Sequence, residues 1–251
     1  MSQFDYLSLA TLSDNFQNLN AFSVFDPSNV RVYRQALYDS VLYPTAGGLA
    51  FALFSVPKGQ GAGVTGTTAP GAVAGTAKTI DDTNMQLAGQ MPTGLMQLVT
   101  SIELEFIPGS VSTANTYTPQ TPYSFVAVPT AQVPISAGAV NDFNAVTQSG
   151  VVTLVINQIT VVQENGLFRF PCRNRRGMGE AALASNSATT SSLAMASPYA
   201  DGDPYDLPAP IRIAPNVAFG LTVSYNAVVA TPTGFNGRLR AWLNGLQFQN
   251  V

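Results

Sequence analysis

Residues 98–109 read Leu-Val-Thr-Ser-Ile-Glu-Leu-Glu-Phe-Ile-Pro-Gly, and this stretch decides the fold class. One face of it is mostly apolar and consists of Leu98, Thr100, Ile102, Leu104 and Phe106. A period of two is the pattern of a half-buried β-strand, and Pro108-Gly109 then turns the chain. We therefore expect a strand that ends at this turn.

The same period recurs on both sides of this strand. Pro and Gly separate the runs, so many short strands with little helix are expected, as in a β-sandwich or jelly roll. The further predicted strands are 49–53, 123–127, 151–162, 168–170, 211–213, 219–225 and 239–248, with a hairpin turn at 164–166.

Two segments depart from the strand pattern. Residues 1–25 are polar and predict an N-terminal arm that is partly helical. Asp26-Pro27 matches a helix N-cap followed by proline at the first helical position, and apolar residues follow at helical spacing to Val41. We predict a helix over 27–42, and either a short helix or a loop over 137–148.

A set of markers occurs twice along the chain. Gly48-Leu49 and Gly166-Leu167 are 118 positions apart (166 − 48), and Gly59-Gln60-Gly61 and Gly177-Met178-Gly179 are also 118 apart (177 − 59). Leu87 and Leu207 follow at a slightly larger offset of 120 (207 − 87), as small loop insertions would give. Self-similarity at a fixed period indicates duplicated units. We expect an all-β double jelly roll, with an N-terminal arm and helix at 1–43, a first unit at 44–149 and a second at 150–251.

The composition favours a structural protein over an enzyme. Charged residues make up only 10% of the chain, against ~25% in typical soluble domains. Uncharged polar surface is easier to bury in protein contacts than charged surface. The chain has no histidine, the commonest general base, and its net charge of −3 does not attract nucleic acid. No cofactor is expected. The first residues lack the features of a signal peptide, so synthesis in a cytoplasm without export is expected.

A family resemblance rests on two stretches. They are Asp82-Thr83-Asn84-Met85, followed by Gly89 and Met91-Pro92, and Ile102-Glu103-Leu104-Glu105-Phe106-Ile107-Pro108-Gly109. The whole chain resembles the double jelly-roll major capsid proteins of tailless icosahedral bacteriophages, which often contain an internal membrane. The resemblance implies a virion protein, assembled in the host cytoplasm, that forms homotrimers with a pseudo-hexagonal outline. The implied partners are copies of the chain, penton or minor capsid proteins, and membrane lipid, without sequence-specific nucleic acid.

Basic residues form two candidate contact sites. Arg169, Arg173, Arg175 and Arg176 fall within eight positions. They are suited to lipid headgroups, phosphates or the carboxylates of a neighbouring subunit, or they form a solvated loop. We favour subunit contact over nucleic acid, because no aromatic residues are interleaved. Arg31 and Arg34 lie on the predicted helix and could face a membrane surface, although an ordinary amphipathic helix that packs on the sandwich is the simpler interpretation.

Acidic residues form two weaker candidates. Asp201, Asp203 and Asp206 have an oxygen-rich spacing that fits Ca²⁺, but Pro204 and Pro208 favour an ordinary polar turn. Glu103 and Glu105 share one face of a strand, as a glycosidase pair would, although a solvent or interface face is the simpler interpretation.

Two functions from other classes stay open beside the capsid hypothesis. A β-sandwich adhesin or carbohydrate-binding spike protein is the first alternative, with Trp242 as a candidate for glycan contact, although a core role is the simpler one. A hydrolase that uses carboxylates without histidine is the second, and we expect no catalysis.

Overall fold

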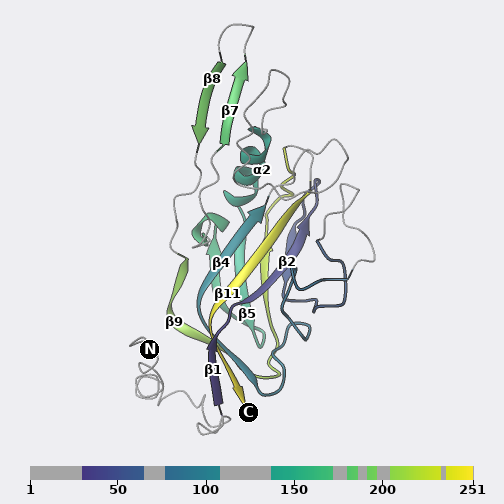
Figure 1. Ribbon diagram of the computed structural model, residues 1–251, viewed down its shortest axis with the longest axis vertical. Helices are drawn as coiled ribbons and strands as arrows, with labels where there is room; N and C mark the ends of the chain where they lie inside the picture. Colours follow the sequence, from purple (N-terminus) through teal and green to yellow (C-terminus); the bar gives the residue numbers. More distant parts are fainter. Residues whose placement is uncertain are drawn as a thin grey trace.

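The computed structural model describes residues 30–64, 77–107, 137–171, 180–185, 191–196, 204–232 and 236–250. These residues form a mostly β structure with two main sheets and little helix, which confirms the all-β class (Figure 1). The predicted N-terminal arm, the strand at 123–127, Arg173, Arg175, Arg176, Asp201 and Asp203 lie outside the described residues.

Two sheets build a sandwich. Sheet A has the order β1-β11-β4-β9, with β2 also paired to β11, and sheet B has the order β3-β10-β5-β6. The strands of sheet A are β1 (Val30–Arg34), β2 (Leu37–Tyr43), β4 (Leu95–Ile107), β9 (Tyr205–Ile213) and β11 (Gly237–Asn250). The strands of sheet B are β3 (Ala50–Leu53), β5 (Val151–Ile156), β6 (Ile159–Asn165) and β10 (Phe219–Ser224).

The remaining elements lie at one end of the sandwich. They are α2 (Ala137–Thr147), the short 3-10 helix η4 (Leu167–Arg169) and a hairpin of β7 (Glu180–Ser185) and β8 (Ser191–Ala196), which projects beyond α2 in Figure 1. Residues 137–148 were predicted as either a helix or a loop, and they form a helix up to Thr147. No helix in the described ranges has the length and apolar character needed to cross a membrane.

The strands pair in a nested order. Apart from β1, which also pairs with β11, the pairs are β2 with β11, β3 with β10, β4 with β9 and β5 with β6, all antiparallel. The chain therefore forms one long hairpin whose two arms wrap so that strands alternate between the sheets, except at β5 and β6. This is the strand order of one eight-stranded jelly roll.

The prediction of a separate jelly roll at 44–149 and at 150–251 is wrong for the described strands. Each sheet combines strands from both ranges, and their side chains share one core. The apparent repeats do not occupy matching places either, since Leu87 precedes β4 whereas Leu207 lies within β9. Gly177-Met178-Gly179 lies outside the described residues, and the markers that are described do not belong to a duplicated unit.

The core lies between the sheets and follows the alternation in the sequence. In β10, for example, Phe219, Leu221 and Val223 are buried while the residues between them are half-buried. Tyr43, Phe51, Phe106 and Tyr225 pack as an aromatic cluster, with ring centroids 4.6 to 6.3 Å apart.

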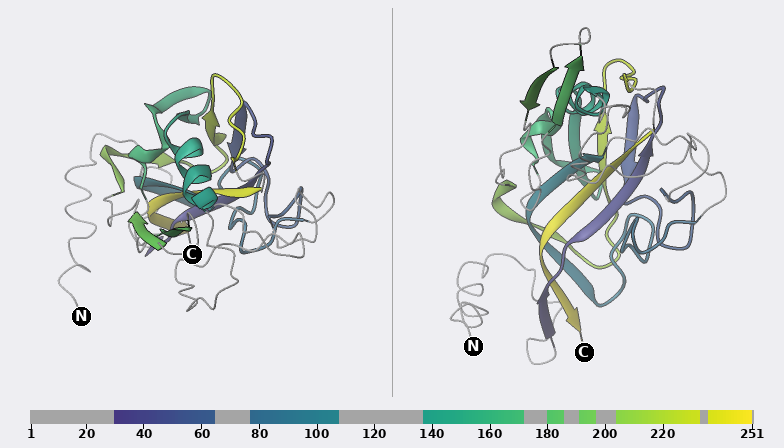
Figure 2. Two further views of the ribbon diagram at one scale, coloured as in Figure 1. Left: turned by 90° about the horizontal axis from the view of Figure 1, so that it is seen from above. Right: turned by 45° about the horizontal axis from the view of Figure 1, so that its top comes forward.

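Helix α2 covers one end of this core, as the view from above in Figure 2 shows. Phe143 of α2 lies 6.5 Å from Phe106, between ring centroids, and the hydroxyl of Tyr225 donates to the carbonyl of Val146 at 3.1 Å. The helix therefore closes this end of the sandwich. Burial raises the pKa of Tyr225 well above its ordinary value.

The predicted helix at 27–42 is wrong, because β1 and β2 occupy its described part. Both strands pair with β11, β1 along Leu246–Asn250 and β2 along Gly237–Leu243. The apolar spacing matched a helix by coincidence, whereas the valines at positions 30, 32 and 41 prefer strands. The partner strand lies about 200 residues away along the chain, so a local pattern could not reveal the pairing.

The single strand predicted over 151–162 is in fact two strands, β5 and the start of β6. The hairpin turn therefore lies at 157–158 and not at 164–166, where it was expected. Asn157 and Gln158 have φ values of 48° and 66° and form a two-residue turn between β5 and β6. Two consecutive residues of positive φ match the strand twist, which favours such turns in hairpins. Residues 166–170 instead continue into η4, so no strand forms over 168–170; Phe170 is buried and Phe168 is exposed.

Candidate functional site

The sequence-predicted contact arginines lie apart in the structure. Arg31 and Arg34 are exposed on β1, where they pair with Gln249 and Leu246 of β11. Arg169 of η4 forms an ion pair with Glu164 of β6, which also accepts a hydrogen bond from the hydroxyl of Tyr205 at 2.8 Å. Glu164 of β6 therefore joins η4, through Arg169, to β9, through Tyr205.

The acidic candidates do not converge on a site either. Asp206 is exposed on β9, and the described ranges contain no group of three or more His, Cys, Asp or Glu residues placed to hold a metal ion. Glu103 is half-buried on β4, beside β11, and its Oε1 accepts from the side-chain amide of Asn244 at 2.7 Å. This contact ties the two central strands of sheet A together.

The most unusual group of charged residues was not predicted. It is a buried ion-pair cluster formed by Asp39 of β2, Lys78, Asp82 and Arg238 of β11. Both carboxylates have no exposed side-chain surface, and the Lys78 side chain is 3% exposed. Buried charges require partners, so the geometry of each pair determines what the cluster does.

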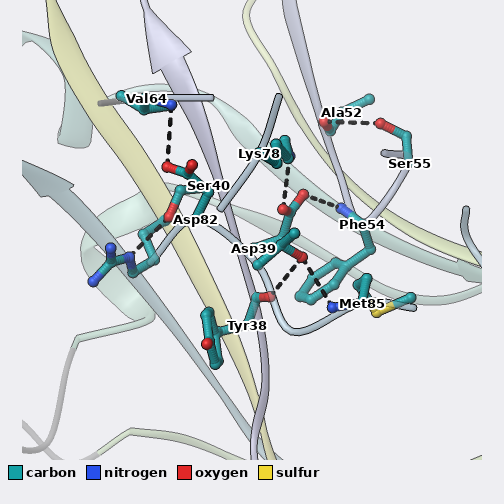
Figure 3. Close-up of polar contacts among 12 residues, drawn as sticks. Tyr38, Asp39, Ser40, Ala52, Phe54, Ser55, Val64, Lys78, Asp82 and Met85 are labelled. Atoms are coloured by element: carbon teal, nitrogen blue, oxygen red, sulfur yellow. Dashed lines mark hydrogen bonds and ion pairs between the residues drawn. The ribbon is translucent and has the colours of Figure 1, made fainter. Parts of the chain in front are cut away.

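Asp39 is held by a cation and a backbone amide. The Nζ of Lys78 lies 2.7 Å from its Oδ1, and the amide of Phe54 donates to its Oδ2 at 2.6 Å (Figure 3). Burial raises the pKa of Asp39 above its ordinary value, although Lys78 and the Phe54 amide oppose the rise. The pair therefore connects β2 to the segments 54–64 and 77–85.

Asp82 has more donors. Its Oδ1 accepts from the amide of Val64 at 3.1 Å and lies 2.6 Å from a guanidinium nitrogen of Arg238, while its Oδ2 accepts from the amide of Thr79 at 2.9 Å. Burial alone would raise the pKa of Asp82, but the two amides, Arg238 and the Thr79 hydroxyl outweigh it and lower the pKa. The same guanidinium donates to the carbonyl of Val64 at 2.7 Å.

Backbone hydrogen bonds around the cluster hold the segments 54–64 and 77–85 and the strand β2 together. Lys78 exchanges hydrogen bonds with Gly59 and Gln60 at 2.8 and 3.0 Å, so the segments 54–64 and 77–85 lie side by side. Residue Asn84 then pairs with Tyr38 of β2, through the Tyr38 amide at 2.9 Å. The segment 77–85 thus covers the outer edge of β2, which would otherwise expose unpaired backbone groups.

The chemistry of this cluster is anchoring. Each carboxylate is neutralised by a cation and is also fixed by backbone amides, so neither is left as a free base or nucleophile. One signal of the cluster was present in the sequence. Asp39 stands among Leu37, Val41 and Tyr43 on the apolar face of its strand, where a charge needs a buried partner.

The chain was compared with protein families and with curated proteins. No protein-family model matches the chain, and no curated protein matches it.

Proposed function

We propose that the chain is a structural subunit that assembles with its own copies into a closed shell, as a viral capsid protein does. The strand order carries this proposal, because viral capsid domains, lectins and cupins are the groups in which such jelly rolls recur. A fold alone does not fix a function, so surface chemistry must separate the three.

The composition separates the shell subunit from the cupins. Histidine is the commonest metal ligand in proteins, and this chain has none, which disfavours a metal site of the kind an enzyme-like jelly roll would use. Low charge supports assembly as well, because a subunit in a shell is covered by its neighbours on several sides.

The alternative, a glycan-binding spike or adhesin, draws on Trp242 of sheet A. The guanidinium carbon of Arg240 lies 5.5 Å from the centroid of the Trp242 ring. Because sugars bind by stacking on such faces, an arginine over the ring disfavours this alternative.

The single jelly roll changes the stoichiometry that we expect. Two jelly rolls per chain would make six blocks from a trimer, whereas the described strands supply one sandwich per chain. We propose that a hexagonal outline, if formed, contains six chains. Contact with internal membrane lipid and with other virion proteins stays a prediction, for which Arg31 and Arg34 on β1 are exposed candidates.

The deciding experiment is light scattering across protein concentrations, followed by negative-stain imaging of the purified chain. Rings or shells with one chain per block are expected. A chain that stays monomeric at every concentration would contradict the proposal, and glycan binding by that monomer would support the adhesin instead.

A further inference from the structure

The outer face of sheet B consists of the side chains of β3, β10, β5 and β6 that do not point into the core. It differs in composition from an ordinary solvent-facing sheet. The middle row across the four strands is Ala52, Thr222, Thr153 and Gln163, which are directly paired in register. Ala52 and Gln163 are exposed and Thr153 and Thr222 are half-buried, so none of the segments that the structure describes buries this row.

The whole face lacks charge. Glu164 is the single charged residue in the four strands, and it is turned to Arg169 and Tyr205 at the side. The rest of the outer face is Ala, Gly, Ser, Thr, Val, Asn and Gln, without an aromatic ring. A sheet facing water usually alternates buried apolar residues with charged or strongly polar ones.

Exposed apolar side chains flank this face. Leu49 precedes β3 and is 56% exposed, Val228 follows β10 and is 53% exposed, and Ile159 and Val161 of β6 are 64% and 40% exposed. Exposed apolar residues in or next to the strands of an uncharged face favour a surface that another molecule covers.

We infer that the outer face of sheet B packs against the same face of a second copy of this chain, across a two-fold axis near Thr222. Charge identifies the occupant. A partner with an ordinary charged surface would lose the hydration of its charges here without gaining a counter-charge. Two copies of an uncharged face meet without repulsion, and identical patches around a two-fold axis are the commonest form of self-association.

The size of the face agrees with a contact inside an assembly. Four strands of four to seven residues, about six on average, give a flat area of roughly 19 by 20 Å, or ~400 Å². That is about half of the ~800 Å² per partner in a typical stable complex. The contact is therefore suited to a shell, where other contacts act with it, and in this respect the inference rests on the proposed function.

Opposite charges at the centre of the face test the inference. Thr222→Lys and Thr222→Glu each place like charges against each other across the axis, and assembly measured by light scattering should require at least about tenfold more protein. An equal mixture of the two variants should restore wild-type assembly. Val32→Lys is the matched control, because Val32 is 38% exposed on a strand of the other sheet, and it should assemble like the wild type.

Cross-linking gives a second measurement that does not depend on a change in stability. In a Cys172→Ser background, Thr222→Cys should form a disulfide-linked dimer on oxidation, and Val32→Cys should not. Wild-type assembly with unaffected Thr222 variants, or with no rescue in the mixture, would overturn this inference and leave the shell proposal in place. A wild-type chain that never assembles would overturn both.

Discussion

The five strands of sheet A contain most of the charged residues of the sandwich, whereas the four strands of sheet B contain only Glu164. Those of sheet A are Arg31, Arg34, Asp39, Glu103, Glu105, Asp206, Arg212, Arg238 and Arg240. Two of them, Asp39 and Arg238, take part in the buried ion-pair cluster. Both sheets line the same core, so the difference lies in how their outer surfaces and edges are completed.

This difference shows two ways to finish a sandwich. Sheet A is completed within the chain, since the segment 77–85 covers the edge of β2 and Pro208 and Pro210 interrupt backbone pairing along the edge strand β9. Sheet B has an uncharged face with exposed apolar neighbours, and we have proposed that a second copy completes it. The predictions below separate the two sheets by the size and pH dependence of their contributions.

The largest effect is expected from Arg238→Ala, which leaves Asp82 buried without its cation. Loss of one partner of a buried pair typically lowers the free energy of unfolding by ~3–5 kcal/mol. Arg240→Ala is the control on the same strand, because Arg240 is half-buried and its hydrogen bonds go to Ser40 and the carbonyl of Asp81. It should lose about 1 kcal/mol in urea unfolding. Equal losses in the two variants would contradict the role given to the cluster.

In sheet B, the largest loss should come from apolar packing. Leu221 is fully buried, and Leu221→Ala should lower the free energy of unfolding by ~2–5 kcal/mol through lost burial and a cavity. The neighbouring Thr222→Ala changes only the outer face and should stay within about 0.5 kcal/mol. A large loss in Thr222→Ala, measured on the monomer, would show that this face packs within the chain.

The pH dependence of stability should come from sheet A. The pKa of Asp82 is lowered in the folded state, so its stabilisation is present above its unfolded pKa of ~3.9 and is lost as pH falls through the folded value. The pKa of Asp39 is raised, so its contribution has the opposite sign and is lost as pH rises through the raised value.

These signs can be measured by thermal unfolding between about pH 3 and pH 6. Asp82→Asn should reduce the loss of stability towards acid, and Asp39→Asn should increase it relative to the wild type. Leu221→Ala removes no titratable group and should shift the whole curve without changing its slope. Parallel curves for all four proteins would show that the cluster does not couple folding to protons.

The smallest effect is expected at the turn of sheet B, and it is a gain. Gln158 has a φ of 66°, a conformation that glycine adopts more easily. Gln158→Gly creates the Asn-Gly pair preferred in such hairpins and should raise the free energy of unfolding by ~0.5–1 kcal/mol. Asn157→Gly should change it by less, since asparagine tolerates this conformation. A loss in Gln158→Gly would show that its side chain contributes to packing.

Local periodicity predicted the strands that are regular and half-buried. β3, β4, β10 and β11 all follow an alternation that is visible in the sequence. It failed at β1 and β2, whose spacing matched a helix and whose partner β11 is distant along the chain. The pairing of strands is a property of the whole chain, so the single jelly roll could not be distinguished from two tandem ones by the order of strands alone.

The ion-pair cluster was hidden for the same reason. Asp39 on an apolar strand face indicated that a buried cation was needed, but Lys78 and Arg238 lie 39 and 199 positions away along the chain (78 − 39 and 238 − 39). Only the fold brings them together. The arginines near residue 170 were more visible, yet the one that is described, Arg169, forms an ordinary half-exposed ion pair within the chain.

The nested strand order also has a consequence for biosynthesis. β11 is the strand between β4 on one side and β1 and β2 on the other. Sheet A therefore lacks its central strand until residues 237–250 have left the ribosome. Until then, β2 has no partner strand, and β4 is paired on one side only, by β9. Contacts between residues so far apart form slowly, and uncovered strands tend to aggregate. We therefore expect the incomplete sandwich to be most prone to aggregation in the interval of synthesis before β11 emerges.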